Sequence, residues 1–97
     1  LIVENCQAHE VDFRDSDLSF SSFQGTDLHM SLFMNTNLSN ANLTDAVNYN
    51  IDVNNNNLKK AKFSFPEVIS LLDYLDIEIT GLVETLYANC KINARYH

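Results

Sequence analysis

The chain has 97 residues, of which 45% are hydrophobic and 20% are charged, and this composition predicts one globular domain with a modest core. The formal net charge of −7 argues against direct nucleic-acid binding, which needs a basic surface, and favours either plain solubility or a partner with a basic surface. No membrane-spanning run or signal-peptide pattern is present and two cysteines make no disulfide framework, so a reducing, cytoplasmic setting is the simpler interpretation.

A period of five residues runs from residue 1 to residue 65. The third position of each block of five is apolar, with Asn48 as the one exception: Val3, Ala8, Phe13, Leu18, Phe23, Leu28, Phe33, Leu38, Leu43, Val53, Leu58 and Phe63. The second position is Asp or Asn in seven blocks: Asp12, Asp17, Asp27, Asn37, Asn42, Asp52 and Asn57. A helix needs apolar spacings of three and four, and a strand needs a spacing of two. A strict period of five therefore predicts a solenoid in which four blocks close one coil of 20 residues.

This solenoid would be an all-β, quadrilateral parallel β-helix of about three coils, with the apolar third positions along its axis. Coils would stack about 4.8 Å apart, the usual distance between strands. Two residues break the pattern. Asn48 would place an amide in the interior, where it must hydrogen-bond to backbone or distort the coil, and Asn56 stands where a small residue is expected. We therefore expect the third coil to be the least regular.

Blocks such as Ser16-Asp17-Leu18-Ser19-Phe20 and Ala41-Asn42-Leu43-Thr44-Asp45 resemble the A(D/N)LXX signature of the pentapeptide-repeat family. This resemblance covers two-thirds of the chain and implies that the β-helix is right-handed. It says less about function, because one fold hosts many functions.

The period ends at Pro66, and residues 66–81 have a different pattern. Pro66 and Glu67 are typical of a helix start, and the apolar residues at positions 68, 71, 72 and 75 predict an amphipathic α-helix. Its apolar side would cap the open end of the last coil, which would otherwise expose backbone edges. Residues 77–79 alternate like a short strand. The chain thus divides into a β-helix (1–65), a capping helix with a short strand (66–81) and a C-terminal extension (82–97).

This ending resembles the C-terminal half of the Qnr-type quinolone-resistance proteins: Leu58-Lys59-Lys60-Ala61-Lys62-Phe63, a helix with Ser70-Leu71-Leu72, and then Ile77-Glu78-Ile79-Thr80-Gly81. The resemblance implies a non-catalytic DNA mimic without a cofactor. Such a protein would bind a type II topoisomerase, DNA gyrase or topoisomerase IV, and protect it from quinolones. It also implies a homodimer through this end, for which the apolar candidates are Val68, Ile69, Leu72, Ile77 and Ile79.

Two departures from the Qnr-type pattern stand out. Asp76 stands where that family tends to have Gly, and the N-terminal half with its projecting loops has no counterpart. We therefore expect the chain to be a fragment or domain of a longer protein.

The same resemblance makes an acidic outer surface the partner-binding site, formed by Asp12, Asp15, Asp17, Asp27, Asp45 and Asp52. For any single one of these residues a different interpretation is favoured. An Asp at the second position of a block can hydrogen-bond the local turn and need not bind a partner at all. The alternative function is accordingly a structural or protein-interaction solenoid with another partner, such as an effector or immunity protein.

Other candidate sites have simpler explanations. His9, His29 and Tyr49 are spaced by 20 residues and predict an exposed aromatic ladder, which lacks a convincing third ligand for a metal. Met30, Leu32 and Met34 point outward and form either a contact patch or ordinary scattered apolar surface. Cys6 falls on an inward position where a buried thiol is expected. No nucleophile is paired with a base, so we do not expect an enzyme.

Overall fold

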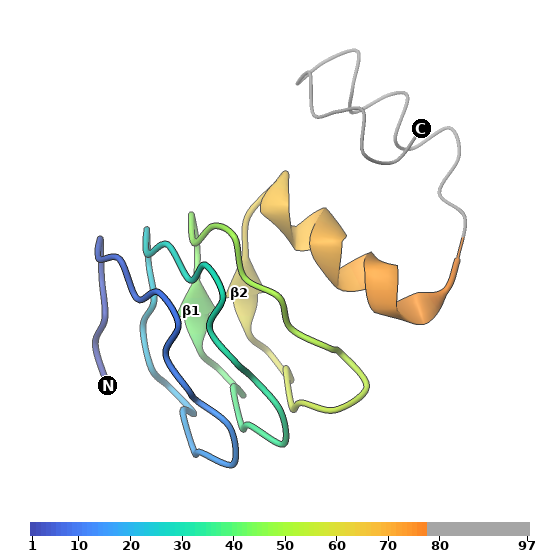
Figure 1. Ribbon diagram of the computed structural model, residues 1–97, viewed down its shortest axis with the longest axis horizontal. Helices are drawn as coiled ribbons and strands as arrows, with labels where there is room; N and C mark the ends of the chain where they lie inside the picture. The colour runs from blue at the N-terminus through green and yellow to red at the C-terminus, as the bar shows by residue number, and fades with distance from the viewer. Residues whose placement is uncertain (78–97) are drawn as a thin grey trace.

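The computed structural model describes residues 1–77, and residues 1–65 wind into stacked coils (Figure 1). Parallel bridges join residues twenty positions apart in four columns: Ile2–Ser22–Asn42–Lys62, Gln7–Asp27–Val47, Asp12–Leu32 and Asp17–Asn37–Asn57. The predicted coil of 20 residues with four sides is therefore confirmed. On the first column the bridges lengthen into two short parallel strands, β1 (Asn42–Leu43) and β2 (Lys62–Phe63).

We number the coils by residue, as coil 1 (1–20), coil 2 (21–40) and coil 3 (41–60). The faces follow the blocks of five. The first face holds residues 1–5, 21–25, 41–45 and 61–65, and the second holds 6–10, 26–30 and 46–50. The third face holds residues 11–15, 31–35 and 51–55, and the fourth holds 16–20, 36–40 and 56–60.

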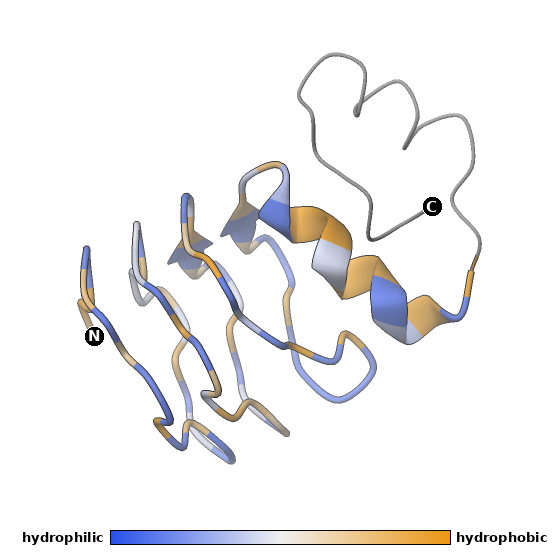
Figure 2. Ribbon diagram, turned by 45° about the horizontal axis from the view of Figure 1, so that its top comes forward, coloured by the Kyte–Doolittle hydropathy of each residue, from blue (hydrophilic) through white to orange (hydrophobic). Residues whose placement is uncertain are grey.

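The core runs along the axis of the stack and consists of the third-position side chains. Phe23, Leu28, Leu38 and Leu43 are fully buried there. Aromatic rings also contact one another between faces and coils: Phe13 meets Phe23 of the first face at 5.5 Å between centroids and stacks on its coil-2 equivalent Phe33 at 5.1 Å. Figure 2 shows the resulting alternation of hydrophobic and hydrophilic segments along each coil.

The second-position Asp and Asn side chains make the turns. Each of the seven accepts a hydrogen bond from the backbone N–H two residues further on, at 2.8–3.1 Å, and the donors are Arg14, Ser19, His29, Ser39, Thr44, Asn54 and Lys59. The fifth residue of most blocks then adopts a positive φ, as in Asp15 and Lys60. This local bond explains how the chain turns so often with only two glycines and one proline.

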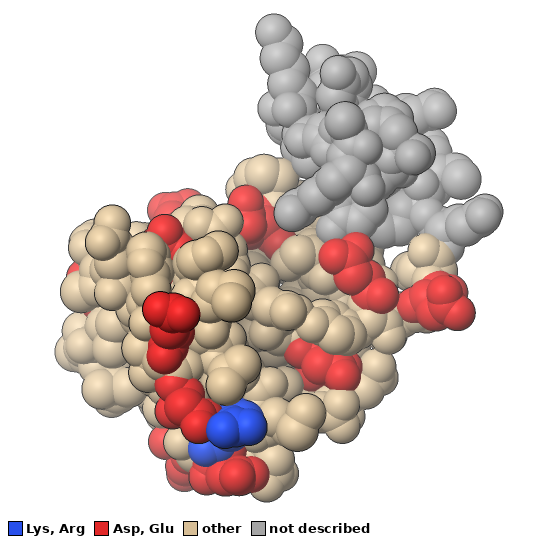
Figure 3. Space-filling view, viewed as in Figure 1, with Lys and Arg blue, Asp and Glu red and all other residues tan. Residues whose placement is uncertain are grey.

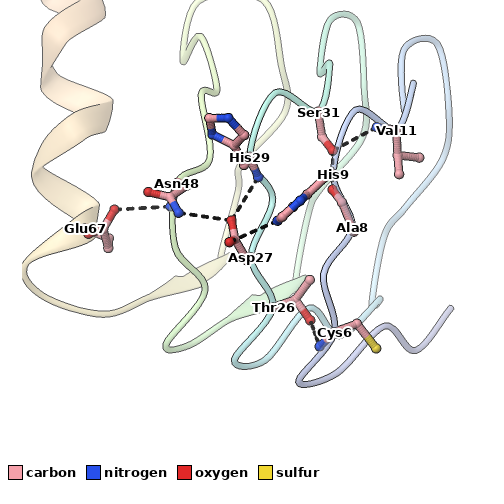
Figure 4. Close-up of polar contacts among 10 residues, drawn as sticks. All are labelled: Cys6, Ala8, His9, Val11, Thr26, Asp27, His29, Ser31, Asn48 and Glu67. Carbon is pink, nitrogen blue, oxygen red and sulfur yellow. Dashed lines mark hydrogen bonds and ion pairs between the residues drawn. The ribbon is translucent and has the colours of Figure 1, made fainter.

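Buried hydroxyl groups at the first positions of coil 2 tie adjacent coils together. The Thr26 hydroxyl accepts a hydrogen bond from the Cys6 N–H at 3.3 Å (Figure 4). It also donates to the Val3 carbonyl. Ser31 makes the same pair of bonds on the next face. Thr36 likewise donates to a carbonyl of coil 1. Each such group satisfies backbone atoms that the corner of a coil would leave unpaired.

Coil 3 is irregular, as expected, but the prediction that Asn48 points inward is wrong. Asn48 is exposed with a φ of 59°, and Tyr49 takes the interior position with 4% of its surface exposed. Tyr49 contacts Phe63 at 5.6 Å between ring centroids. Turning the amide outward avoids the cost of burying it, and the large ring fills the axis instead. The predicted exposed ladder of His9, His29 and Tyr49 is therefore wrong at Tyr49.

The slip at Asn48 shifts the hydrogen bonds between coils 2 and 3. The Asp15 N–H bonds the Met34 carbonyl, 19 positions on, but the Asn35 N–H bonds the Asn55 carbonyl, 20 positions on. The regular pattern returns with the bridge between Asn37 and Asn57. The irregular stretch thus runs from residue 48 to residue 55.

The predicted cap is present, but it is a 3₁₀ helix rather than an α-helix. Helix η1 spans Glu67–Leu75, with a three-residue bond from the Ile69 N–H to the Pro66 carbonyl at 3.1 Å. Leu71 is buried and, with Val68, contacts the core of the coils, and Figure 1 shows η1 beside β2 at the end of the stack. Within residues 1–77 no helix is long and apolar enough to cross a membrane. The predicted strand at 77–79 lies outside the described residues from residue 78 on, as does the extension at 82–97.

Candidate functional site

The six predicted acidic residues all reach the outer surface, but they do not share one face. Asp12, Asp15 and Asp52 lie on the third face, whereas Asp27 lies on the second. Asp17 belongs to the fourth face and Asp45 to the first. In Figure 3 the acidic side chains accordingly appear at separate places across the surface, and in one place they lie beside basic side chains. The structure therefore brings three of the six together and distributes the others around the stack.

Four of these six carboxylates also hold turns. Asp12, Asp17, Asp27 and Asp52 are among the seven second-position residues whose side chains accept a backbone hydrogen bond. The structural interpretation of the motif thus explains why Asp occurs at these positions. Their charges still face outward, and hydrogen bonding holds them in place. The Ser19 bonds to Asp17, for example, lower the pKa of that carboxyl.

Asp12 pairs with Arg14 on the third face. The Arg14 guanidinium donates to both carboxylate oxygens of Asp12, at 2.9 and 2.8 Å. These bonds, together with the Arg14 N–H, lower the pKa of Asp12 to about 2. The carboxylate is therefore ionised at neutral pH, but a neighbouring cation balances its charge.

Asp27 is the centre of a polar network on the second face (Figure 4). It accepts hydrogen bonds from the Asn48 side-chain amide at 3.0 Å and from the His29 N–H at 3.1 Å, and His9 Nε2 lies 3.0 Å from its other oxygen. The Asn48 bond and then the His9 contact lower the pKa of Asp27. The network shows what the outward amide of Asn48 binds. The His9 and His29 rings meet edge-on at 5.7 Å, and among the described residues no group of three His, Cys, Asp or Glu could hold a metal.

The predicted dimer residues have unequal exposure. Ile69 is only 4% exposed, so its side chain leaves almost no surface for a dimer contact. Val68 is half-buried against the core of the coils. Leu72 is half-buried and Ile77 is 54% exposed, and both keep surface for a partner. Ile79 lies outside the described residues.

Cys6 is exposed, contrary to the prediction of a buried thiol. It lies in coil 1, which is covered by another described coil only on the side of coil 2, and its thiol donates a hydrogen bond to the Glu4 carbonyl at 3.0 Å. The inward position alone was therefore not enough to bury it.

The sequence did not predict a hollow of about 290 Å³ on the third face. Its walls include Arg14, Leu32, Phe33, Met34, Asp52 and Tyr74. The outward apolar residues of coil 2 gave a partial signal. The hollow also needs the irregular path of coil 3, which no periodic pattern describes.

The repeat geometry agrees with a comparison of protein families. Residues 4–33 and 12–47 match the family described as pentapeptide repeats, in eight copies. Residues 4–47 belong to the pentapeptide-repeat family. The match ends at residue 47, directly before the slip at Asn48.

A solved structure supports this fold. Full-length QnrB1, a plasmid-mediated fluoroquinolone resistance protein, matches with a TM-score of 0.55 and 15% identity over 78% of this chain. Two trypsin-treated variants of QnrB1 match with TM-scores of 0.43 and 0.41 at 20% and 17% identity, over 84% and 75% of this chain. The chain spans 40% of the length of full-length QnrB1. A comparison with curated proteins found no match. The fold of these coils is thus a right-handed β-helix like that of QnrB1.

Proposed function

We propose that this pentapeptide-repeat protein is a non-catalytic binding module for a type II topoisomerase, DNA gyrase or topoisomerase IV, and that it protects this enzyme from quinolones. The proposal is supported by the fold shared with QnrB1, which is described as a fluoroquinolone resistance protein. The observation that carries it is the set of outward carboxylates held in place on a rigid stack. Such a surface offers a basic DNA-binding surface the negative charge that duplex phosphates would offer.

The turn hydrogen bonds favour this role energetically. Asp17 and Asp27 keep a lowered pKa through bonds to nearby groups, so both are charged at neutral pH. Their positions are fixed before a partner arrives, and a surface ordered in advance loses less entropy on binding.

A gyrase supercoiling assay with and without ciprofloxacin tests this proposal. We expect the purified chain to bind the enzyme and to restore supercoiling in the presence of the drug. A variant with four Asp→Asn changes (D12N, D17N, D27N and D52N) should lose this effect. Asn makes the same turn bond at Asn37, Asn42 and Asn57, so the variant should fold normally, which circular dichroism would verify.

A matched variant controls for the changes themselves. N37D, N42D and N57D alter the same turn position but add charge, and this variant should protect the enzyme at least as well as the original chain. If the original chain neither binds gyrase nor relieves the drug, or if the Asp→Asn variant protects equally well, the proposal is wrong.

A second candidate is a protein-interaction solenoid with a different basic partner, such as an effector target or a toxin. The distribution of the six carboxylates over four faces favours it, because a saddle-shaped partner would contact only some of them. This candidate would be favoured over the first if the chain left gyrase fully active without the drug and did not change its inhibition by ciprofloxacin.

We also propose that two copies join through the C-terminal end, with Leu72 and Ile77 in the contact. Sedimentation equilibrium would show a dimer, and Leu72→Asp should shift it toward monomer by placing a charge in an apolar contact. A strict monomer at high micromolar concentration would exclude this assembly.

A further inference from the structure

The third face of the β-helix has an open backbone edge between coils 2 and 3. Between coils 1 and 2 this face is paired normally, because the Phe13 N–H donates to the Leu32 carbonyl at 2.9 Å and the Leu32 N–H donates to the Val11 carbonyl at 2.8 Å. On the other side of the same segment, the Phe33 N–H and the Ser31 carbonyl make no hydrogen bond to coil 3 or to any other described residue. A donor and an acceptor are thus left open two residues apart.

The equivalent groups on the first face show what is missing. There the Phe23 N–H donates to the Asn42 carbonyl at 2.7 Å, and the Asn42 N–H donates to the Ser21 carbonyl at 2.9 Å. Phe33 and Ser31 occupy the same positions in their block as Phe23 and Ser21. The open edge is therefore a local feature of the third face and not a general property of the repeat.

Helix η1 holds coil 3 away from this edge. The Tyr74 hydroxyl donates to the Asn50 side-chain oxygen, and the Asn54 side-chain amide donates to the Tyr74 carbonyl at 3.1 Å. Figure 1 shows this part of coil 3, in yellow-green, curving out toward η1. The slip at Asn48 and this attachment together keep the gap open.

The open edge lies in the hollow of about 290 Å³, to which coil 2 contributes the apolar side chains of Leu32, Phe33 and Met34. Leu32 and Met34 are 47% and 54% exposed. In coil 1 the same two positions hold Asp12 and Arg14, and in coil 3 they hold polar residues as well. On this face the apolar side chains of coil 2 therefore lie between polar side chains of coils 1 and 3. Open backbone groups next to apolar side chains are what an extended peptide uses when it adds to the edge of a sheet.

Charge around the hollow favours a basic peptide. Asp52 lines the hollow, and Asp12 and Asp15 lie on the same face. The one basic side chain there, among the described residues of this face, is Arg14, and it is bound to Asp12. The net charge of the rim is negative, so Lys or Arg beside the docked segment would be attracted and acidic residues repelled.

We propose that the third face binds an extended segment of a protein partner at the open edge of coil 2. The segment pairs its backbone with the Phe33 N–H and the Ser31 carbonyl. It places an apolar side chain against Leu32 and Met34, and its basic flanks meet Asp15 and Asp52. This inference rests on the proposed role as a protein-binding module, but it does not depend on the partner being a topoisomerase.

An NMR titration of the full chain tests the proposal with the capped peptide acetyl-Lys-Thr-Val-Thr-Lys-amide as the probe, because its central Val would pair beside Leu32 with its side chain on the same side. We expect saturable shifts centred on the amides of Leu32, Phe33 and Met34. The same peptide with a methylated central nitrogen should bind about tenfold more weakly, since it loses a backbone hydrogen bond. A peptide with Glu in place of Lys should also bind more weakly, and the difference should shrink at high salt.

Variants of the chain separate this site from unspecific binding. Leu32→Asn removes the apolar wall and places the consensus turn residue at its position, so the fold should be retained and peptide binding should fall about tenfold. Phe20→Ser removes an even more exposed apolar side chain at a different corner and should leave binding unchanged.

Several outcomes would overturn the inference. Shifts that map elsewhere, equal binding by the methylated peptide, or unchanged binding by Leu32→Asn would each do so. Concentration-dependent shifts of Phe33 without peptide would assign the edge to a second copy of the chain instead. Failure of the gyrase assay with intact peptide binding would contradict only the topoisomerase proposal, whereas gyrase protection with no peptide binding would contradict only this one.

Discussion

Hydrogen bonds from individual polar side chains hold adjacent coils together at the corners. Asn56 stands where the repeat expects a small residue, yet its amide replaces the hydroxyl of the other corners. Its oxygen accepts from the Thr36 N–H at 3.0 Å, and its nitrogen donates to the carbonyls of Phe33 and Asp52. This is the same link between coils that Thr26 makes one coil earlier. Although Asn56 departs from the sequence pattern, its amide makes the same hydrogen bonds between coils as the Thr26 hydroxyl.

Asn56→Ala should lower the free energy of unfolding by about 1–3 kcal/mol, because the Thr36 N–H and the Phe33 carbonyl would lose a partner in a buried place. Urea unfolding followed by circular dichroism would measure this loss. Ser39→Ala is the control, since the Ser39 hydroxyl makes no hydrogen bond to the described residues, and it should change stability by less than about 0.5 kcal/mol. Equal losses in both variants would refute the role given to Asn56.

Asp12 gives a prediction about acid. Its pKa falls from an ordinary 3.8 to about 2 because Arg14 bonds the charged form. A pKa lowered by folding adds stability that is fully present above about 4 and is lost as the pH falls toward 2. Asp12→Asn keeps the turn but loses the ion pair. The stability difference between the two proteins should therefore be constant near neutral pH and shrink between pH 4 and pH 2. A difference that stayed the same at pH 2 would show that Arg14 does not stabilise the folded state through this carboxylate.

Helix η1 packs on the end of the stack and is hydrogen-bonded to coil 3. Its side chains differ in burial. Leu71 is buried against the core of the coils, while Leu75, one turn further on, is 44% exposed. A buried Leu and an exposed Leu on one helix allow the cap to be tested with the same substitution.

Leu71→Ala should destabilise the chain by about 2–5 kcal/mol, since it removes buried methyl groups and leaves a cavity at the end of the core. Leu75→Ala should cost less than about 1 kcal/mol, because its side chain is already largely in water. Thermal unfolding of both variants would measure the contrast. If the two variants have the same midpoint temperature of unfolding, η1 does not cap the coils.

The regular coils could be predicted from the sequence, and the irregular one could not. The period of five specified the four ladders and the buried apolar column, including Phe23 and Leu38. It could also mark Asn48 as a misfit. It could not say that the chain would slip by one residue and bury Tyr49, because that choice depends on the space beside Phe63. The attachment of Tyr74 to coil 3, which shapes the hollow, depends in turn on that slip.

The helix type and the surface were predicted less well. Pro66 and the apolar spacing gave the position of η1, but its short-range bonds make it a 3₁₀ helix. The acidic residues were correctly placed on the outside. Their arrangement over four faces follows from where Asp rather than Asn stands at each turn, so it could be worked out only once the coil was certain.

Among the coils that the structure describes, only coil 2 has a complete neighbouring coil on both sides. Stability in such a repeat is close to a sum of contributions from neighbouring coils, so its ends open more readily than its centre. Coil 2 is hydrogen-bonded to coil 1 on one side and coil 3 on the other, and it holds most of the fully buried side chains.

Hydrogen exchange should show this order and also reveal the open edge. The amides of Leu28 and Leu38, both bonded to coil 3, should exchange more slowly than those of Val3 and Ala8 in coil 1. The Phe33 amide should exchange faster than the Phe23 amide, although both side chains are buried, because within residues 1–77 only the Phe23 amide has a backbone partner. NMR of the full chain in deuterated water would measure all of these rates. Equal protection of Phe23 and Phe33 would mean that the third face is closed in solution.

The turn bond at the second position of each block has a consequence for how such a chain can evolve. A carboxylate and an amide both make this bond here, at four Asp and three Asn positions. A codon change between Asp and Asn can then alter the electrostatic surface while the coil beneath it is conserved. Replacement of the four aspartates would remove four of the seven net negative charges. Lineages of this repeat are thus free to drift between partners of different charge without first having to evolve a new fold.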